Sequence, residues 1–340
     1  MDVAKRPNES PSRSSDGPLA MFRAPEWGLV VGIVATLAVI YAFDTRGSFF
    51  SAYSRESMLH QIALFGVMSV GVAVVIIAGG IDLSIGSVVA LSGLICAKLI
   101  TEWLPTGVPE GTPAGGLVVG LAIAISLGVG LAVGLLHGAL INLLRLPPFI
   151  ATLATMAGLR SVSRLISQSS VTVSNPTFRE FGRNTWWSLA IFAVVAAVVS
   201  TMMGTTVVGR HFFALGGNET AARLNGLPTR RLKTIAYSLS ATLAALGGIL
   251  FTGKSGQGDP EMGISYELYA ITAAVVGGCS LSGGVGSIRG TVLGLFLLQI
   301  VIKGTSQVVP GVDSSRVEGL VLGSVVVLAV AFNQRFRGRG

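Results

Sequence analysis

The sequence predicts an all-α fold, a polytopic membrane bundle of about ten transmembrane helices. Hydrophobic residues make up 51% of the 340 residues and charged residues only 12%, too few charges for the surface of a soluble protein. The apolar residues also fall in blocks of about 20, the length of a helix that crosses a bilayer. A soluble domain is therefore excluded as the main body of the chain.

The predicted elements follow a tail, residues 1–26, whose Ser, Pro and charged residues indicate a disordered segment. Residues 27–333 form the predicted transmembrane domain, and residues 334–340 form a short basic tail. The apolar blocks of the domain predict spans at 27–43, 58–78, 81–100, 117–136, 149–166, 186–204, 235–252, 266–277, 287–303 and 317–332.

Two places among these spans predict broken or re-entrant helices. Only Gly79 and Gly80 separate the second and third spans, and the eighth is too short to cross a bilayer. Segments 78–93 and 276–294 share a Gly pair, a stretch with Ser and then a Gly-Ser pair before an apolar run. Asp82 or Ser84 can cap the helix that follows the first Gly pair.

Interrupted helices in matching halves of a membrane protein point to a transport path. The alternative, which the sequence leaves open, is that the small residues only let helices pack closely, with Asp82 as a structural cap and Gln299 in an interhelical hydrogen bond. The candidate path residues are polar and lie at or near membrane depth: Asp82, Ser84, Asn142, Ser280, Ser282 and Gln299.

The basic residues predict the orientation. With the amino terminus inside, more than half of the 24 Lys and Arg residues fall on the inner side. Both termini and the loop 205–234 are then cytoplasmic. These inner loops account for the net charge of +8, so we expect contact with membrane lipid and no nucleic-acid partner.

The stretch GILFTGKS, residues 248–255, satisfies the P-loop pattern and raises the alternative of an ATPase. A P-loop follows a strand and opens a helix, but this stretch ends an apolar helix and precedes SGQGDPEMG. Two Cys and three widely separated His also form no metal cluster. We therefore expect no catalytic, cofactor-binding or metal-binding residues in this chain.

Within the inner loop, GGNETAARLNGLPTRRL predicts one short helix over residues 218–225. Asn218 suits the N-cap and Glu219 the first turn, while Gly226 and Pro228 end the helix. A helix of about two turns is not stable alone. Either it packs on its own bundle, with Arg230, Arg231 and Lys233 at lipid headgroups, or it docks into a partner protein.

Five stretches carry a family resemblance over residues 58–332: AGGIDLSIGSVVALSG, LPPFIATLATMAGLR, ALGGNETAARLNGLP, AYSLSATLAALGGILFTG and GISYELYAITAAVVGGCSLSGGVGSIRGTVLG. In this order they resemble the ribose/xylose-type ABC transporter permeases. The resemblance implies a permease subunit of the bacterial plasma membrane that forms a homodimer or heterodimer and imports a monosaccharide or small polyol. It also implies an extracytoplasmic sugar-binding protein, which sets the choice of sugar, and a separate ATPase subunit that binds ATP and Mg²⁺.

By this resemblance, the helix at 218–225 corresponds to the coupling helix that fits a groove on the ATPase. The Asp82 break resembles the segment near the translocation path. A stand-alone secondary transporter is the alternative, although the chain lacks the series of acids and His that proton coupling needs. The residues implied in ATPase coupling are Asn218, Glu219, Ala221, Ala222, Arg223 and Leu224.

The chain departs from the family pattern at two positions. Tyr269 stands where the family usually carries Asp, and Val285 stands where it usually carries Arg. Arg289 follows four residues after Val285, so the charge can have moved to an equivalent face if both lie on one helix.

Overall fold

The structure is a computed structural model that describes residues 26–45, 47–104, 113–308, 318–324 and 327. It confirms the all-α fold. Glu26 begins the first helix, and the rest of the predicted tails 1–26 and 334–340 lies outside the described residues. The helices and strands are α1 Glu26–Phe43, α2 Ala52–Ile77, α3 Ile85–Lys98, the π-helix Leu99–Trp103, α4 Pro113–Asn142, α5 Pro148–Ile166, β1 Val171–Thr172, α6 Pro176–Arg183, α7 Thr185–Thr205, α8 Val207–Gly217, α9 Glu219–Leu224, α10 Thr229–Ser255, β2 Gln257–Gly258, α11 Tyr266–Val276 and α12 Ile288–Val308.

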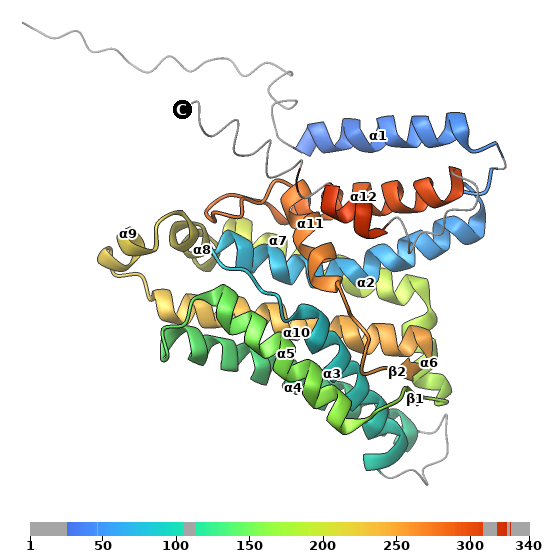
Figure 1. Ribbon diagram of the computed structural model, residues 1–340, viewed down its shortest axis with the longest axis horizontal. Helices are drawn as coiled ribbons and strands as arrows, with labels where there is room; N and C mark the ends of the chain where they lie inside the picture. The colour runs from blue at the N-terminus through green and yellow to red at the C-terminus, as the bar shows by residue number, and fades with distance from the viewer. Residues whose placement is uncertain (1–25, 46, 105–112, 309–317, 325–326, 328–340) are drawn as a thin grey trace, which may run out of the picture.

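The long helices run side by side, so that the bundle has two distinct ends (Figure 1). We call the end with α8 and α9 the α9 end. The opposite end carries α6 and the two-stranded antiparallel pair in which Val171 faces Gly258, and we call it the β end. Helix α10 runs the whole way between them, from the residues after α9 to β2.

Eight helices in the described part of the chain are long and apolar enough to cross a membrane. They correspond to eight of the ten predicted spans, and α11 is the predicted short one. Most of the tenth predicted span, 317–332, lies outside the described residues. The fold is therefore that of a polytopic membrane protein.

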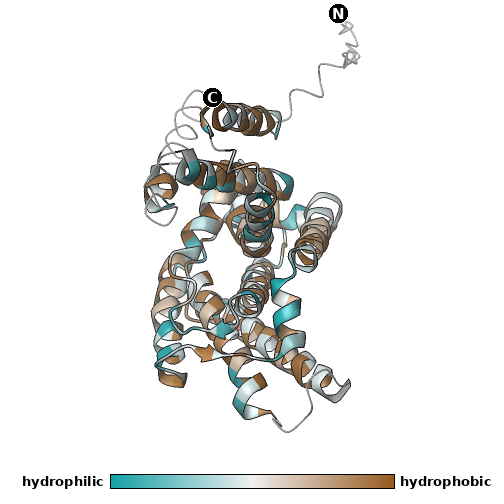
Figure 2. Cartoon of the chain, turned by 90° about the vertical axis from the view of Figure 1, so that its right-hand side faces the viewer, coloured by the Kyte–Doolittle hydropathy of each residue, from teal (hydrophilic) through white to brown (hydrophobic). Residues whose placement is uncertain are grey.

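Burial differs strongly between the spanning helices. In the most apolar stretch of α2, 94% of the residues are buried, against 6% in α1. Helix α2 contacts α7, α10, α11 and α12, whereas α1 lies at the edge of the bundle against α12 (Figure 1). Hydrophobic residues also cover outward surfaces of the bundle, as expected where helices face lipid (Figure 2).

Both predicted helix breaks are present. Helix α2 ends at Ile77, residues 78–84 are not helical, and α3 starts at Ile85. Gly79 has φ +83°, a backbone conformation that favours glycine. Helix α11 has only 11 residues, about 17 Å, and lies between the non-helical segments 259–265 and 277–287.

The structure corrects the boundaries of the inner loop. The loop predicted at 205–234 is mostly helix, because α8 fills residues 207–217 and α10 begins at Thr229. The P-loop-like stretch, residues 248–255, forms the last two turns of α10, and Gly256 caps that helix with φ +74°. No loop there is available to surround a phosphate.

Candidate functional site

Helix α9 begins at the predicted N-cap. The Asn218 side chain accepts a hydrogen bond from the backbone N–H of Ala221 at 2.9 Å. At the other end, the Asn225 amide donates to the carbonyl oxygen of Ala221 at 2.8 Å. The helix ends at Leu224, before Gly226, as the sequence predicts. Local side chains therefore satisfy the backbone of a helix too short to be stable alone.

Helix α9 presents one face to the bundle and the other to the surroundings. Ala222 is 5% exposed and packs inward, whereas Leu224 is 80% exposed. Glu219, Ala221 and Arg223 are also exposed, and α9 projects beyond the other helices at its end of the bundle (Figure 1). Helix α9 therefore leaves Leu224 and two charged side chains, Glu219 and Arg223, accessible from outside the bundle.

An ion pair ties α9 to α10. The Lys233 ammonium lies 2.7 Å from a carboxylate oxygen of Glu219. Lipid headgroups were one alternative predicted for Lys233, and its ion pair with Glu219 was not predictable because residues 14 apart in different helices carry no local signal. Glu219 thus has a partner inside the chain.

Behind α9, three backbone segments meet at Gly216, near the end of α8. A side chain at this position would collide with the carbonyl oxygen of Ile77 and with the backbone of Gly284. The Gly284 N–H in turn donates to the Ile77 carbonyl at 2.9 Å. The chain leading into α9 is therefore in direct contact with the break after α2 and with the turn after α11.

A cavity of about 260 Å³ lies at this junction. Gly79 and Gly80 of the first break, Asn218 and Glu219 of α9, and Ser282 of the turn after α11 all line it. Of the predicted path residues, Ser282 is thus the one placed beside the predicted coupling residues. Ser280 is buried next to it, and its hydroxyl accepts from the Ser282 N–H at 3.3 Å.

Asp82 lies fully buried in the first break. One carboxylate oxygen accepts from the Ser84 N–H at 3.0 Å and from the Ser84 hydroxyl at 2.7 Å. The other accepts from the Ser240 hydroxyl of α10 at 3.0 Å. Asp82 therefore caps the start of α3 and fastens the break to α10, while Ser84 itself makes no side-chain cap.

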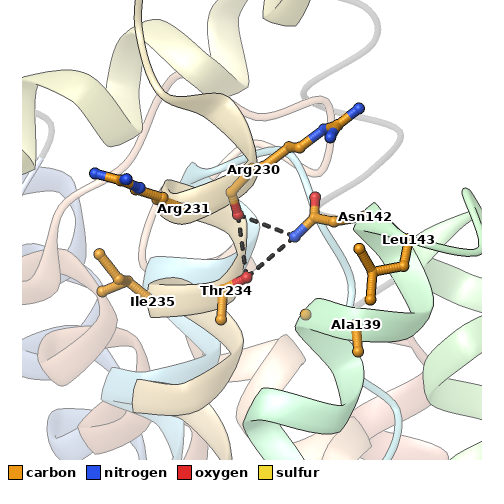
Figure 3. Close-up of a pocket in the computed structure, with 8 residues that line it drawn as sticks. Ala139, Asn142, Leu143, Arg230, Arg231, Thr234 and Ile235 are labelled. Atoms are coloured by element: carbon orange, nitrogen blue, oxygen red, sulfur yellow. Dashed lines mark hydrogen bonds between the residues drawn. The ribbon is translucent and has the colours of Figure 1, made fainter.

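Asn142 occupies a separate place, at the end of α4 (Figure 3). Its amide donates to the Arg230 carbonyl and to the Thr234 hydroxyl, both at 3.0 Å. These bonds fix the end of α4 to the first turns of α10 beside a pocket of about 520 Å³. Gln299 lies in a different cavity on α12, so the structure does not bring the six predicted path residues into one site.

Two arginines of α5 that hold the non-helical segment 259–265 were not predicted from the sequence. Arg160 donates to the carbonyl oxygens of Pro260 and Met262, the first at 3.0 Å. One turn further, Arg164 forms an ion pair with the exposed Glu261, and this pair lowers the pKa of the Glu261 carboxyl. The only signal in the sequence is the occurrence of two basic residues in one apolar span.

The two departures from the family pattern have different surroundings. Tyr269 is 3% exposed, and its ring stacks on that of Phe65 with ring centroids 4.3 Å apart. Val285 is 52% exposed in the turn before α12, while Arg289 lies inside α12. The two positions do not share a helix, so the proposed transfer of charge by one helical turn is wrong.

The bundle, its interrupted helices and the short capped helix α9 at one end of it define a polytopic membrane permease. The chain belongs to the family described as "Branched-chain amino acid transport system / permease component", which matches residues 54–330. This is a family of transporter components, not of enzymes. In the described part of the chain, no group of three His, Cys, Asp or Glu residues is placed to hold a metal ion.

Several sugar permeases are similar to this chain over most of its length. The ribose import permease protein RbsC of Bacillus subtilis is 36% identical over 306 residues, 88% of this chain and 90% of that protein. RbsC of Escherichia coli K12 is 34% identical and covers 89% of this chain and 92% of its own. The L-arabinose transport system permease protein AraH of Escherichia coli K12 is 34% identical, with 81% of each chain covered.

Proposed function

We propose that this chain is the membrane-spanning subunit of an ABC importer for a monosaccharide or a similarly small polyol. Two supports are independent of each other. Permeases named for ribose and L-arabinose are similar over most of the chain. The fold also combines spanning helices with two mid-bundle breaks, as in transporters whose path lies where helices are interrupted.

The observation that carries the coupling part of the proposal is the backbone contact at Gly216. Helix α9 is the coupling helix, and the separate ATPase subunit binds ATP and Mg²⁺. Glu219, Ala221, Arg223 and Leu224 are exposed and contact the ATPase, whereas the buried Ala222 anchors α9 to the permease.

The mechanism follows from these contacts. Two permease subunits, identical or related, each place one α9 on an ATPase subunit. When ATP closes the ATPase pair, the two α9 helices move, and Gly216 passes the displacement to the break at 78–84 and to the turn at 277–287. The helix bundles then rock and expose a path toward a loaded extracytoplasmic sugar-binding protein.

The membrane placement follows from the same assignment. The chain lies in the bacterial plasma membrane, with the α9 end and both termini in the cytoplasm and the β end outside. The concentration of Lys and Arg in the loop around α9 supports this orientation.

Reconstitution tests the function. The chain is placed in liposomes with or without its ATPase and binding protein, and uptake of labelled D-ribose, L-arabinose and D-fructose is measured. We expect uptake only with all components and ATP. Uptake by the chain alone would favour a secondary transporter, and nucleotide binding by the chain alone would favour the P-loop alternative.

Paired charge removal tests the coupling helix. We expect Glu219→Ala with Arg223→Ala to abolish association with the ATPase while membrane insertion is unchanged. The matched control is Arg164→Ala with Glu261→Ala, which likewise removes one basic and one acidic side chain but near the β end. Equal association of both double variants with the ATPase would refute the assignment of α9.

A further inference from the structure

A cavity of about 250 Å³ lies in the half of the bundle away from α9. It is bounded by the first half of α2, the last turns of α10, the start of α11 and the second half of α12. The residues that matter for the argument are Gln61, Phe251, Tyr266, Tyr269, Gln299 and Lys303.

The cavity is polar although its walls belong to membrane-spanning helices. Two amides, an ammonium group, phenol hydroxyls and the carboxyl group of Glu318 line it, and Glu318 and Tyr269 are hydrogen-bonded to each other. Gln299 is 5% exposed, and its amide nitrogen has no hydrogen-bond partner among the described residues. A buried donor that lacks an acceptor is costly, so this amide is suited to a ligand that brings oxygen atoms into the cavity.

Four of the lining residues, Phe65, Phe251, Tyr266 and Tyr269, are aromatic. The Phe65 ring stacks on Tyr269 at 4.3 Å and meets Tyr266 edge to face at 4.8 Å. Tyr266 also lies 4.9 Å from Phe251, measured between ring centroids. A cavity lined by both aromatic rings and amide groups matches a sugar ring, which has an apolar C–H face and a rim of hydroxyl groups.

The volume suits a ligand of about one sugar unit. At about 30 Å³ per water in the liquid, the cavity holds about eight waters. That space suits one pentose or hexose, whose about ten to twelve non-hydrogen atoms are bonded and so pack more closely than separate waters. Tyr269, one of the two departures from the family pattern, supplies part of the aromatic lining.

We propose that this cavity is a monosaccharide-binding site within each permease subunit, with Gln299 donating to a sugar oxygen and the aromatic lining contacting the ring. The proposal rests on the function proposed above and adds a place where the sugar is held between the binding protein and the α9 end. Gln61 and Lys303 supply further donors.

A thiol-protection experiment tests the site in the full chain assembled with its ATPase in nanodiscs. Ser57, which lines the cavity, is changed by Ser57→Cys, while the native Cys96 and Cys279 are 0% and 1% exposed and react slowly. We expect D-ribose, L-arabinose or D-fructose to slow the labelling of the new thiol several-fold, with protection rising with sugar concentration. L-Leucine, a branched-chain amino acid, is expected to give no protection.

Two further changes on α12 are added to Ser57→Cys. We expect Gln299→Leu, which keeps the side-chain size, to abolish protection. The matched control is Thr305→Val, because the Thr305 hydroxyl donates only to Val301 of its own helix at 2.7 Å, and it is expected to keep protection. If Gln299→Leu fails to assemble, Gln61→Leu takes its place.

Three results would overturn the site: equal labelling with and without every sugar, protection that survives both glutamine changes, or equal protection by L-leucine. Uptake by the complete transporter separates this failure from that of the proposed function. ATP-driven sugar uptake without protection refutes only the cavity site, whereas no uptake of any sugar refutes the transport assignment itself.

Discussion

At the scale of single residues, Gly216 has the least room for a side chain of the described glycines at the α9 end. Gly216 is in contact with backbone atoms of Ile77 and Gly284, whereas an added carbon at the next position, Gly217, would meet nothing within 4 Å. Two neighbouring glycines in one helix therefore differ in what they permit, and this difference makes a controlled experiment possible.

We expect Gly216→Ala to destabilise the protein by about 1–3 kcal/mol, because the methyl group overlaps backbone that cannot move aside as a side chain can. Transport coupled to ATP hydrolysis should fall as well. Gly217→Ala should leave both unchanged or raise stability slightly. Thermal unfolding in detergent and ATP-dependent uptake measure the effect, and equal behaviour of the two variants would contradict the contact.

Substitutions of Asp82 test whether this residue is a structural cap or part of the transport path. We expect Asp82→Ala to cost about 1–3 kcal/mol, because the buried Ser84 N–H and Ser240 hydroxyl lose their acceptor. Asp82→Asn keeps one acceptor oxygen and should cost clearly less. The free energy of unfolding and the rate of uptake should fall together in each variant. Normal stability with lost uptake in Asp82→Asn would instead assign the carboxylate to the path.

At the scale of elements, α9 is stable only through its caps and its contacts. We expect Asn218→Ala to destabilise α9 by about 1 kcal/mol and to weaken binding to the ATPase. Asn218→Ser restores a side-chain acceptor and should restore the affinity. Co-purification or binding kinetics with the ATPase measures this order, and an alanine variant that binds as tightly as the serine variant would contradict it.

Elements differ in how far the sequence predicts them. The spans were predictable because a bilayer forces helices into apolar blocks, and the N-cap of α9 was predictable because Asn218 acts on a residue three positions away. Helix α8 was missed because its 11 residues are too few for a span and because three of them, Gly209, Gly216 and Gly217, are glycines, which have low helix propensity.

The connections between elements were not predictable. Nothing in the sequence near Arg160 specifies the carbonyls of Pro260 and Met262, and nothing near Glu219 specifies Lys233. Helix periodicity gives the buried face of each helix but not its neighbour. For the same reason the six predicted path residues could be selected for polarity and depth, yet their separation into different sites appeared only with the structure.

At the scale of the whole molecule, the two ends of the bundle should lie on opposite sides of the membrane. Gln257 at the β end and Leu224 at the α9 end are both exposed. We expect Gln257→Cys to react with a membrane-impermeant maleimide in intact cells, and Leu224→Cys to react only after permeabilisation. The opposite result would invert the topology and remove the basis for placing α9 on a cytoplasmic ATPase.

Helix α10 is continuous over 27 residues, about 40 Å, from the neighbourhood of α9 to β2. Lys233 joins it to α9 near one end, and β2 follows directly at the other. If α9 binds an ATPase as proposed, linkage makes the coupling reciprocal: an ATPase that shifts α10 and so changes the β end would itself be shifted, by the same coupling free energy, when a partner binds at the β end. In the proposed assembly, α10 would therefore transmit binding at the β end to the ATPase as one continuous helix.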